Sequence, residues 1–266
     1  CTQQADHIIY VSWATEEPFR AAPAPHAKTQ QSLVLLHAPD QPITANTRAW
    51  LNMLDINLHH HIHWDSSAEV DSDLIDETSW SKDVSRLARL LTGRGIGLVL
   101  SGGGARGYAH VGAIRALEEA GIPIDLVGGT SIGAVVAGLY ATGHDSESMS
   151  AVLVKHLSHR KQLLDFTLPI TSFLKGRKLE VIMRTFFGNV DIVDAWLSFF
   201  CVSTDLTSAA EVVHRSGPMW RYVRASMSLP VTFPPQVDGE QLLVDGCLMN
   251  NYPANVMRDS FGCGTV

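Results

Sequence analysis

Two glycine-rich turns restrict the fold of this chain more than any other feature, because each lies between a short apolar run and a helix-forming run. The first turn reads S-G-G-G-A-R-G at residues 101–107 and follows the apolar residues 98–100. The second reads G-G-T-S-I-G at residues 128–133 and follows Leu126-Val127. Strand, turn and helix repeated in this order predict an α/β fold with a mainly parallel sheet.

The second turn also fits G-x-S-x-G, the sharp strand-to-helix turn that exposes a nucleophilic serine. Its glycines, Gly129 and Gly133, leave room for a strained backbone at Ser131. The first turn leaves the backbone N–H groups of residues 103–105 bare at a helix start, where such groups bind anions. A nucleophile beside this nest of donors predicts acyl transfer. The alternative is that both segments are plain βα turns in which glycine permits close packing.

A serine nucleophile needs a base, and Asp245 is the candidate. It ends the apolar run 241–244 and precedes Gly246. Many serine hydrolases have the order Ser, Asp, His, but the last histidine of this chain is His214. Either the histidine lies beyond this sequence, or Asp245 takes the proton of Ser131 directly, with a pKa raised by burial. The alternative for Asp245 is a turn-capping role.

The sequence pattern changes near residue 92, which predicts an N-terminal segment of residues 1–92 and a catalytic domain of residues 93–266. In the first segment we expect strands at 7–11 and 32–36, a polar loop over 59–78 and an amphipathic helix at 83–91. In the second we expect strands at 98–100, 126–127, 199–203, 210–214 and 241–244, and helices at 108–120, 132–142, 146–164, 178–187 and 219–227. The expected class is therefore α/β, a three-layer sandwich with a central mainly parallel sheet, plus a smaller N-terminal α/β element.

Composition narrows the classes of function. A formal net charge of −7 over 266 residues, with no basic stripe, argues against nucleic-acid binding. The four cysteines (Cys1, Cys201, Cys247 and Cys263) lack metal-ligand spacing and suggest a reducing compartment. No apolar run reaches the roughly 18 residues of a membrane-spanning helix. Because the chain starts at Cys1 without a methionine and ends as if approaching a strand, we expect a fragment that is truncated at its C-terminus.

Taken in order, the glycine run, the G-x-S-x-G turn and the pair Asp245-Gly246 resemble the patatin-like phospholipase family. Stretches at 85–89, 127–133, 220–229 and 250–254 are similar to one branch of it, the neuropathy target esterases. The resemblance covers most of the chain and is closest over 85–258. It implies that Ser131 is the nucleophile and Asp245 its only base. It also implies that Gly129 and Gly133 shape the nucleophile elbow, which is the strand-to-helix turn at Ser131. The oxyanion hole is implied to consist of Gly102, Gly103, Gly104, Ala105, Arg106 and Gly107.

The resemblance carries further expectations about chemistry and place. Members of the family hydrolyse acyl esters of phospholipids and lysophospholipids without metal, so we expect neither a metal nor a cofactor. The branch implies lysophosphatidylcholine or phosphatidylcholine as substrate, at the cytoplasmic face of the endoplasmic reticulum. Membrane attachment is then expected to depend on N-terminal parts outside this sequence, and the fragment alone to be soluble or weakly membrane-bound.

One position departs from the family pattern. The chain reads Asp245-Gly246-Cys247 where the family usually reads D-G-G or D-G-A. Because cysteine is small, we expect the turn after Asp245 to tolerate it.

Two alternatives to an esterase were weighed. Residues 102–107 also fit G-x-G-x-x-G, the dinucleotide fingerprint. That fingerprint requires an acidic residue at the end of the next strand, whereas Asp125 precedes the apolar pair Leu126-Val127, so the dinucleotide interpretation is disfavoured. A catalytically silent scaffold domain is the other alternative, because fold does not fix function. The retention of Ser131 and Asp245 argues against it.

Other residues have competing interpretations. His59, His60, His61 and His63 lack cysteine or paired carboxylates at ligand spacing, which favours a solvated loop over a metal site. For Arg106, phosphate binding and bracing of the loop stay equally open. A set of apolar residues are candidates for an acyl channel, although helix packing accounts for most of them: Phe166, Leu168, Ile170, Phe173, Leu174, Phe186, Phe187, Met227, Leu229 and Phe233.

Overall fold

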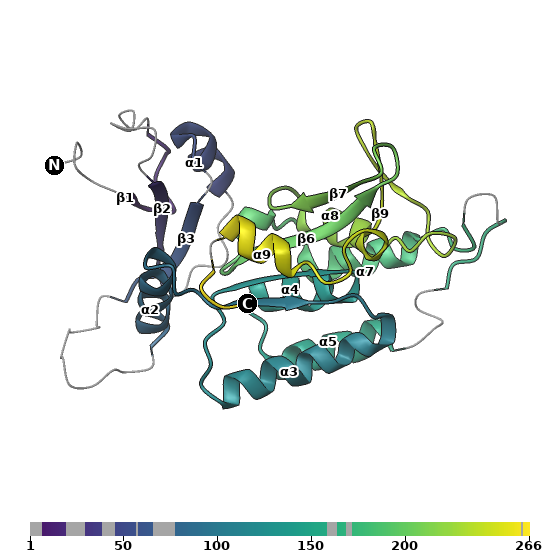
Figure 1. Ribbon diagram of the computed structural model, residues 1–266, viewed down its shortest axis with the longest axis horizontal. Coiled ribbons are helices and arrows are strands. Elements are labelled where there is room, and N and C mark those ends of the chain that lie inside the picture. Colours follow the sequence, from purple (N-terminus) through teal and green to yellow (C-terminus); the bar gives the residue numbers. More distant parts are fainter. Residues whose placement is uncertain are drawn as a thin grey trace.

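The structure is a computed structural model that describes residues 7–19, 30–38, 46–56, 58–65, 78–158, 164–168, 172–261 and 263–266. In these residues the strands form a three-stranded and a six-stranded sheet (Figure 1). The elements are, in chain order, β1 (His7–Trp13), β2 (Gln30–His37), α1 (Thr47–Leu54), β3 (Leu58–His63), α2 (Ser79–Leu91), β4 (Gly97–Leu100), η2 (Gly104–Gly107), α3 (Tyr108–Glu119), β5 (Leu126–Thr130), α4 (Ile132–Ala141), α5 (Ser146–Leu157), α7 (Arg177–Phe187), η3 (Ile192–Asp194), β6 (Ser198–Asp205), β7 (Ala210–His214), α8 (Met219–Ser226), β8 (Gln236–Asp238), β9 (Gln241–Asp245), η4 (Gly246–Leu248) and α9 (Ala254–Phe261).

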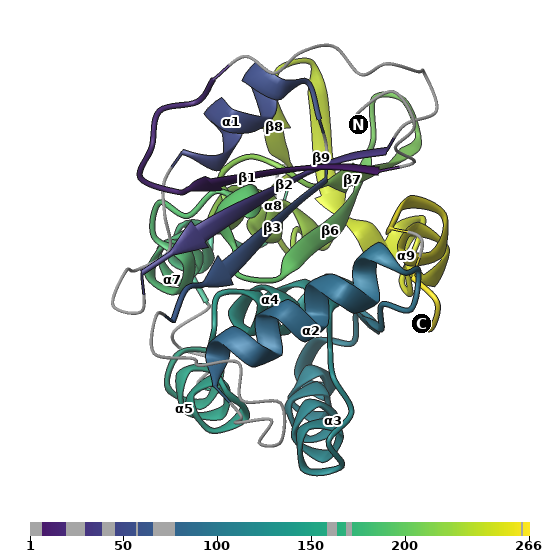
Figure 2. The same cartoon turned by 90° about the vertical axis from the view of Figure 1, so that its left-hand side faces the viewer.

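The N-terminal sheet has the order β1-β2-β3, with all strands parallel. Its core is small and centres on Trp50 of α1, which packs with Leu33 and Leu35 of β2. Figure 2 shows β1, β2 and β3 in front of the larger sheet, with α2 running below them. The expected N-terminal α/β element is therefore present. The boundary that the sequence predicts at residue 92 lies between α2 and β4.

The larger sheet is mixed. Strands β4, β5 and β6 are parallel, as the strand–turn–helix pattern predicts, whereas β7, β8 and β9 join through antiparallel pairings. Helices cover both faces of the sheet, which confirms the three-layer α/β class. Seen end-on in Figure 2, α9 lies on one side of these strands and α7 on the other.

Alternation of side chains along each strand divides the core into two layers. Val127 and Cys201 pack toward α4, α7 and α8, whereas their chain neighbours Leu126 and Phe200 pack toward α9. Helix α4 is apolar on every side, and nine of its residues are buried. A helix of this composition is stable only inside the protein, so the segment after Ser131 is fixed at the centre of the fold.

Strands β5 and β9 meet end to end along the same edge of β6. The first half of β6 pairs with β5 as far as Thr130 and Val202, and its second half pairs with β9, beginning with Ser203 and Asp245. Since β7 takes the opposite edge of β6, β9 continues in the row of β5 but runs in the other direction. The residues at the two facing strand ends, Ser131 and Asp245, are therefore brought together from 114 positions apart.

Some sequence expectations need correction. The predicted loop over 59–78 is wrong at its start, because residues 58–63 form β3; residues 66–77 lie outside the described part of the chain. The helix expected over 146–164 ends at Leu157, and residues 159–163 are not described. Helices α1 and α9 were not predicted. Within the described ranges, no helix has both the length and the apolar character needed to cross a membrane.

Candidate active site

Ser131 forms the sharp turn between β5 and α4, with φ 55° and ψ −125°. A residue with a side chain adopts this conformation at a cost of about 1–3 kcal/mol, which the surrounding structure has to offset. Gly129 and Gly133 make the turn possible because neighbouring backbone lies too close to either residue to leave room for a side chain. A Cβ on Gly129 would lie 2.7 Å from the Gly133 carbonyl carbon, and one on Gly133 would lie 2.2 Å from the Leu100 carbonyl oxygen.

The hydroxyl of Ser131 donates a hydrogen bond to Oδ2 of Asp245, with an O···O distance of 2.7 Å. Asp245 is buried, and its Oδ1 accepts the backbone N–H of Cys247 at 2.9 Å. Its own N–H donates to the carbonyl of Ser228 at 3.0 Å. Gly246 allows the chain to turn here, because a Cβ at this position would lie 2.4 Å from the Val202 carbonyl oxygen. Both carboxylate oxygens of Asp245 therefore accept a hydrogen bond, Oδ2 from the Ser131 hydroxyl and Oδ1 from the Cys247 N–H.

Burial raises the pKa of Asp245 above its ordinary value, and the hydrogen bonds from Cys247 and Ser131 oppose that rise. A raised pKa makes this carboxylate a stronger base than an exposed aspartate. The thiol of Cys247 faces the same carboxylate, and burial, followed by the charge of Asp245, raises its pKa to about 11. The cysteine that departs from the family pattern is therefore protonated near neutral pH and supports the turn.

The glycine-rich run before η2 lies against the serine. A Cβ on Gly102 would lie 3.2 Å from Cβ of Ser131, and the Gly102 N–H already donates to the Asn251 carbonyl at 3.1 Å. The first hydrogen bond of η2 runs from the Arg106 N–H to the Gly103 carbonyl. The N–H groups of residues 103–105 precede that bond and lie on an exposed part of the chain. Exposed N–H groups at a helix start are typical of anion sites, and the oxyanion hole expected here stays a prediction.

The other residues of this run have different surroundings. Gly107 is buried, and a Cβ there would lie 2.2 Å from Cγ1 of Ile132, so its role is close packing against the start of α4. Arg106 is exposed beside the nest. Both interpretations of its side chain, phosphate binding and loop bracing, remain predictions.

The structure adds two groups that the sequence did not identify. Ser226, at the end of α8, accepts the backbone N–H of Ser131 on its Oγ at 2.8 Å. The carbonyl of Asn250 accepts the hydroxyl of Thr130 at 2.9 Å, and the next residue, Asn251, binds Gly102. The sequence signal for Ser226 was a serine in an otherwise buried helix end before Pro230, which is too common a pattern to single out a site residue.

The candidate acyl-channel residues differ in burial: Phe186, Met227 and Phe233 are partly buried against the core, and Leu229, in the loop between α8 and β8, is 44% exposed. Leu174 and Phe187 are core residues, 3% and 2% exposed. In contrast, Phe166, Leu168 and Phe173 are 69%, 79% and 53% exposed. Ile170 lies outside the described residues.

Phe166, Leu168 and Phe173 lie on residues 164–168 and 172–176, which we call the apolar arm. The apolar arm projects at the right-hand end of the molecule in Figure 1. The N–H of Phe173 donates to the Val231 carbonyl and that of Leu174 to the Thr232 carbonyl. Residues 231 and 232 follow Ser228, whose carbonyl binds Asp245. The apolar arm is therefore anchored to the loop that holds the base.

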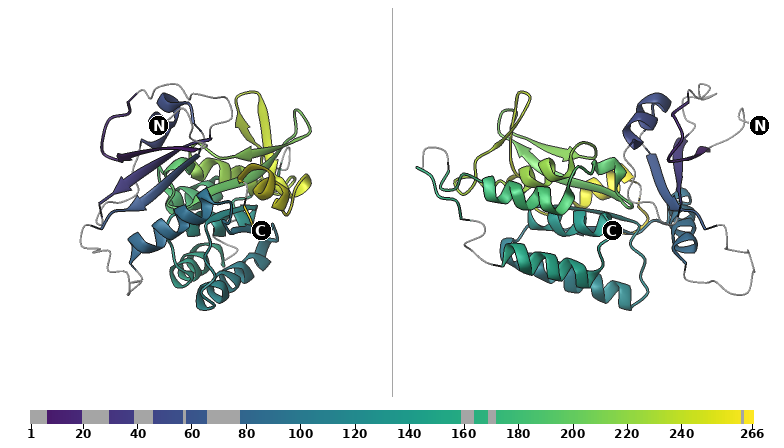
Figure 3. Two further views of the ribbon diagram at one scale, coloured as in Figure 1. Left: turned by 60° about the vertical axis from the view of Figure 1, so that its left-hand side comes forward. Right: turned by 180° about the vertical axis from the view of Figure 1, so that it is seen from behind.

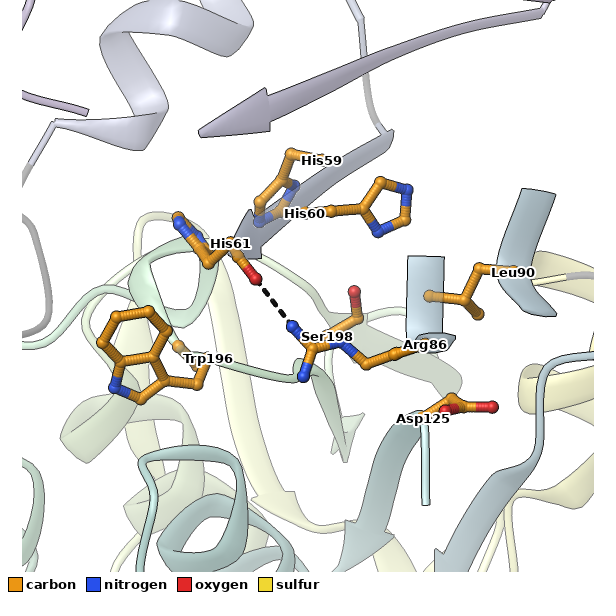
Figure 4. A pocket seen from close by; sticks show the side chains of 9 residues that line it. His59, His60, His61, Arg86, Leu90, Asp125, Trp196 and Ser198 are labelled. Atoms are coloured by element: carbon orange, nitrogen blue, oxygen red, sulfur yellow. Dashed lines mark hydrogen bonds between the residues drawn. The ribbon is translucent and has the colours of Figure 1, made fainter. Parts of the chain in front are cut away.

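The histidine-rich tract is not a solvated loop. Nε2 of His59 and of His61 lie 2.8 and 2.9 Å from the carbonyl oxygen of Val193, and His63 stacks on Trp196 at 3.8 Å. Figure 4 shows His59, His60 and His61 on β3 near Trp196 and Arg86, with the Arg86 guanidinium donating to the His61 carbonyl. The loop prediction was wrong because neutral imidazoles bury well when a carbonyl satisfies their N–H. In the part of the chain that is described, no group of three or more metal-ligating side chains occurs.

The N-terminal sheet packs at the amino end of β6, since residues 193–196 immediately precede that strand. Further contacts in the same region join Thr47 to Asp194 and Arg48 to Asp191. Figures 1 and 3 show the sheet at the end of the molecule opposite the apolar arm. The histidine tract therefore attaches the N-terminal unit and lies far from the dyad.

Comparison with known proteins agrees with this geometry. The sequence profile described as "Patatin-like phospholipase" matches residues 98–258. The chain is 38% identical over 286 residues to "Neuropathy target esterase sws" of Drosophila melanogaster, covering 97% of this chain and 20% of that protein. It is 40% identical over 283 residues to "Patatin-like phospholipase domain-containing protein 7" of Mus musculus, covering 97% of this chain and 21% of that protein.

Among solved structures, VipD from Legionella pneumophila has a TM-score of 0.46 and 17% identity, covering 59% of this chain and 47% of that chain. The chain spans about a fifth of the length of the curated relatives named above. The matched region, residues 98–258, contains both glycine-rich turns and the aspartate that pairs with Ser131. This chain belongs to the patatin-like phospholipase family.

Proposed function

We propose that this chain is a serine esterase that hydrolyses acyl esters of lysophospholipids and phospholipids through a Ser131–Asp245 dyad. The observation that carries the proposal is the 2.7 Å hydrogen bond from the Ser131 hydroxyl to a buried carboxylate, at a strained turn beside a row of N–H donors. Within the described residues the hydroxyl has no histidine partner, and its recorded hydrogen bond runs to Asp245. The base is therefore the aspartate itself.

In the first half of the proposed reaction, Oγ of Ser131 attacks the ester carbonyl carbon while Asp245 takes the hydroxyl proton. The carbonyl oxygen becomes an oxyanion, which the N–H groups of Gly103, Gly104 and Ala105 bind. When the tetrahedral intermediate collapses, the ester C–O bond breaks and the leaving alcohol receives the proton from Asp245. The acyl group remains on Ser131 as an ester.

In the second half, Asp245 takes a proton from water, and the hydroxide adds to the acyl carbonyl. Collapse then breaks the bond to Oγ, which recovers the proton from Asp245, and the fatty acid leaves. Raising the pKa of Asp245 by burial favours the two steps in which the carboxylate accepts a proton, from Ser131 and from water. Losing one oxyanion donor in such a site typically reduces the rate by about a hundredfold or more.

The lipid part of the proposal is supported by the apolar arm and by the family. Large exposed apolar side chains on a segment anchored beside the base suit a long acyl chain. We propose lysophosphatidylcholine as the preferred substrate, with phosphatidylcholine as the alternative. By the same resemblance, we propose that the full-length protein works at the cytoplasmic face of the endoplasmic reticulum, with attachment supplied by parts outside this sequence.

The test is covalent labelling by an organophosphate followed by mass spectrometry of the peptide that contains Ser131. We expect one adduct on Ser131, and no turnover of a phenyl ester by Ser131→Ala or Asp245→Asn. Retained turnover in either variant would reject the dyad. A folded chain that forms no adduct would favour the silent scaffold instead.

A further inference from the structure

The side chain of Ser226 connects the nucleophile to the neighbouring strand. Ser226 is fully buried, at 0% exposure. Its Oγ accepts the backbone N–H of Ser131 at 2.8 Å and donates to the carbonyl oxygen of Val202 at 2.6 Å. One hydroxyl therefore binds two backbone groups, one in the turn after β5 and one on β6.

These two groups need a bridge because the chain leaves the sheet at Ser131. Thr130 and Val202 are the last residue pair of the β5–β6 ladder. At Ser131 the backbone turns to φ 55° and ψ −125°, and its N–H is directed at Ser226 rather than at a strand. Buried N–H and C=O groups without partners destabilise a fold. A hydroxyl can donate and accept through one atom, which apolar side chains cannot do.

The same carbonyl lies close to the base. A Cβ on Gly246, next to Asp245, would lie 2.4 Å from the Val202 oxygen. Contacts therefore connect Ser131 through Ser226 and the Val202 carbonyl to Gly246, the residue after the base. A change at Ser226 alters the support of the nucleophile without touching any reacting atom.

We infer that Ser226 is a positioning residue, whose hydroxyl holds the strained backbone of Ser131 so that the Ser131 hydroxyl stays on Asp245. The catalytic consequence rests on the proposed function, whereas the hold on the backbone does not. Because Ser226 is fully buried and both of its hydrogen bonds run to backbone groups, we expect substrate to contact neither of them. The loss of this hydroxyl should therefore reduce kcat and leave KM unchanged.

The experiment compares Ser226→Ala with Ser32→Ala. Ser32 on β2 is also 0% exposed and hydrogen-bonds through Oγ to His7 at 3.0 Å, so both variants lose one buried hydroxyl. Hydrogen–deuterium exchange of the peptide that contains Ser131 measures how firmly the backbone of the turn is held. The kcat and KM for a phenyl ester measure the effect of the substitution on catalysis. We expect faster exchange and a kcat about tenfold to a hundredfold lower in Ser226→Ala alone, with KM changed less than twofold.

Ser226→Thr keeps a hydroxyl and should restore both the slow exchange and most of kcat. If it folds like the wild type but restores neither, the hydroxyl does not hold the turn. Wild-type exchange in Ser226→Ala, or an equal loss of kcat in Ser32→Ala, would also overturn the inference. An inactive wild-type chain would instead reject the proposed function, and the exchange data would then decide alone whether Ser226 holds the turn.

Discussion

Gly133 is the position at which one added methyl group should disturb the site most. A Cβ there would lie 2.2 Å from the carbonyl oxygen of Leu100 and 2.7 Å from that of Ser101. Non-bonded atoms pack at roughly 3.5 Å, so either the turn or the end of β4 has to move by about 1 Å. The obstructing atoms belong to the backbone and cannot rotate away.

Two consequences follow for Gly133→Ala. Overpacking of this kind destabilises a fold by about 1–3 kcal/mol, and a displacement of about 1 Å at a reacting group reduces the rate by about a hundredfold. The matched control is Gly112→Ala in α3, where an added Cβ has no neighbour within 4 Å. Replacing a helical glycine by alanine there should stabilise the protein by about 0.5–1 kcal/mol.

The assay measures unfolding in urea and kcat for a phenyl ester on the same preparations. We expect Gly133→Ala to lose both stability and activity, and Gly112→Ala to gain stability with unchanged kcat. If Gly133→Ala keeps the wild-type kcat, the close approach of β4 to the elbow is not what positions Ser131. Loss of stability without loss of activity would lead to the same conclusion.

Three further predictions concern substrate and pH. Micellar lysophosphatidylcholine should be hydrolysed faster than vesicular phosphatidylcholine, and faster fatty-acid release from intact vesicles would show the substrate proposal to be wrong. Leu168→Ser on the apolar arm should reduce hydrolysis of the micellar lipid several-fold more than that of a short soluble ester, whereas Ile122→Ser, which is 42% exposed and lies before β5, should affect neither. Burial lowers the pKa of both His37 and His214 from 6.5 to about 4. The unfolded chain therefore binds more protons between these values, and Tm should fall as pH decreases from 6.5 toward 4; a constant Tm over that range would contradict the burial of these imidazoles in neutral form.

The sequence predicted the elbow well because its requirements are local. The pattern G-x-S-x-G needs only five consecutive residues to be identified, and its glycines, Gly129 and Gly133, lie where a Cβ would collide with backbone. The α/β class followed in the same way from strand and helix periodicity. The end of an apolar strand before Gly246 made Asp245 the candidate base, and the resemblance favoured that role over turn capping, which the local pattern alone left open.

The parts that sequence reasoning missed depend on partners far along the chain. Ser226 acquires its role only because β6 runs beside it and Ser131 lies 95 positions away. On β3, His61 is buried and His59 and His63 are partly buried because residues 193–196 contact them, and no pattern within residues 59–63 indicates those contacts. The antiparallel pairing of β9 with β6 could not be predicted either, since a strand's direction is set by its neighbours and not by its own sequence.

That antiparallel entry accounts for the contact on which the proposed dyad depends. In a parallel strand, a residue in register with Ser203 would be followed by chain that continues past the carboxyl edge of the sheet. Because β9 approaches β5 head-on, its final residue faces the nucleophile at 2.7 Å, and the following turn closes over the carboxylate through the Cys247 N–H. The carboxylate is thus buried beside the turn and in direct contact with the Ser131 hydroxyl, which is the arrangement that the proposed proton transfer requires.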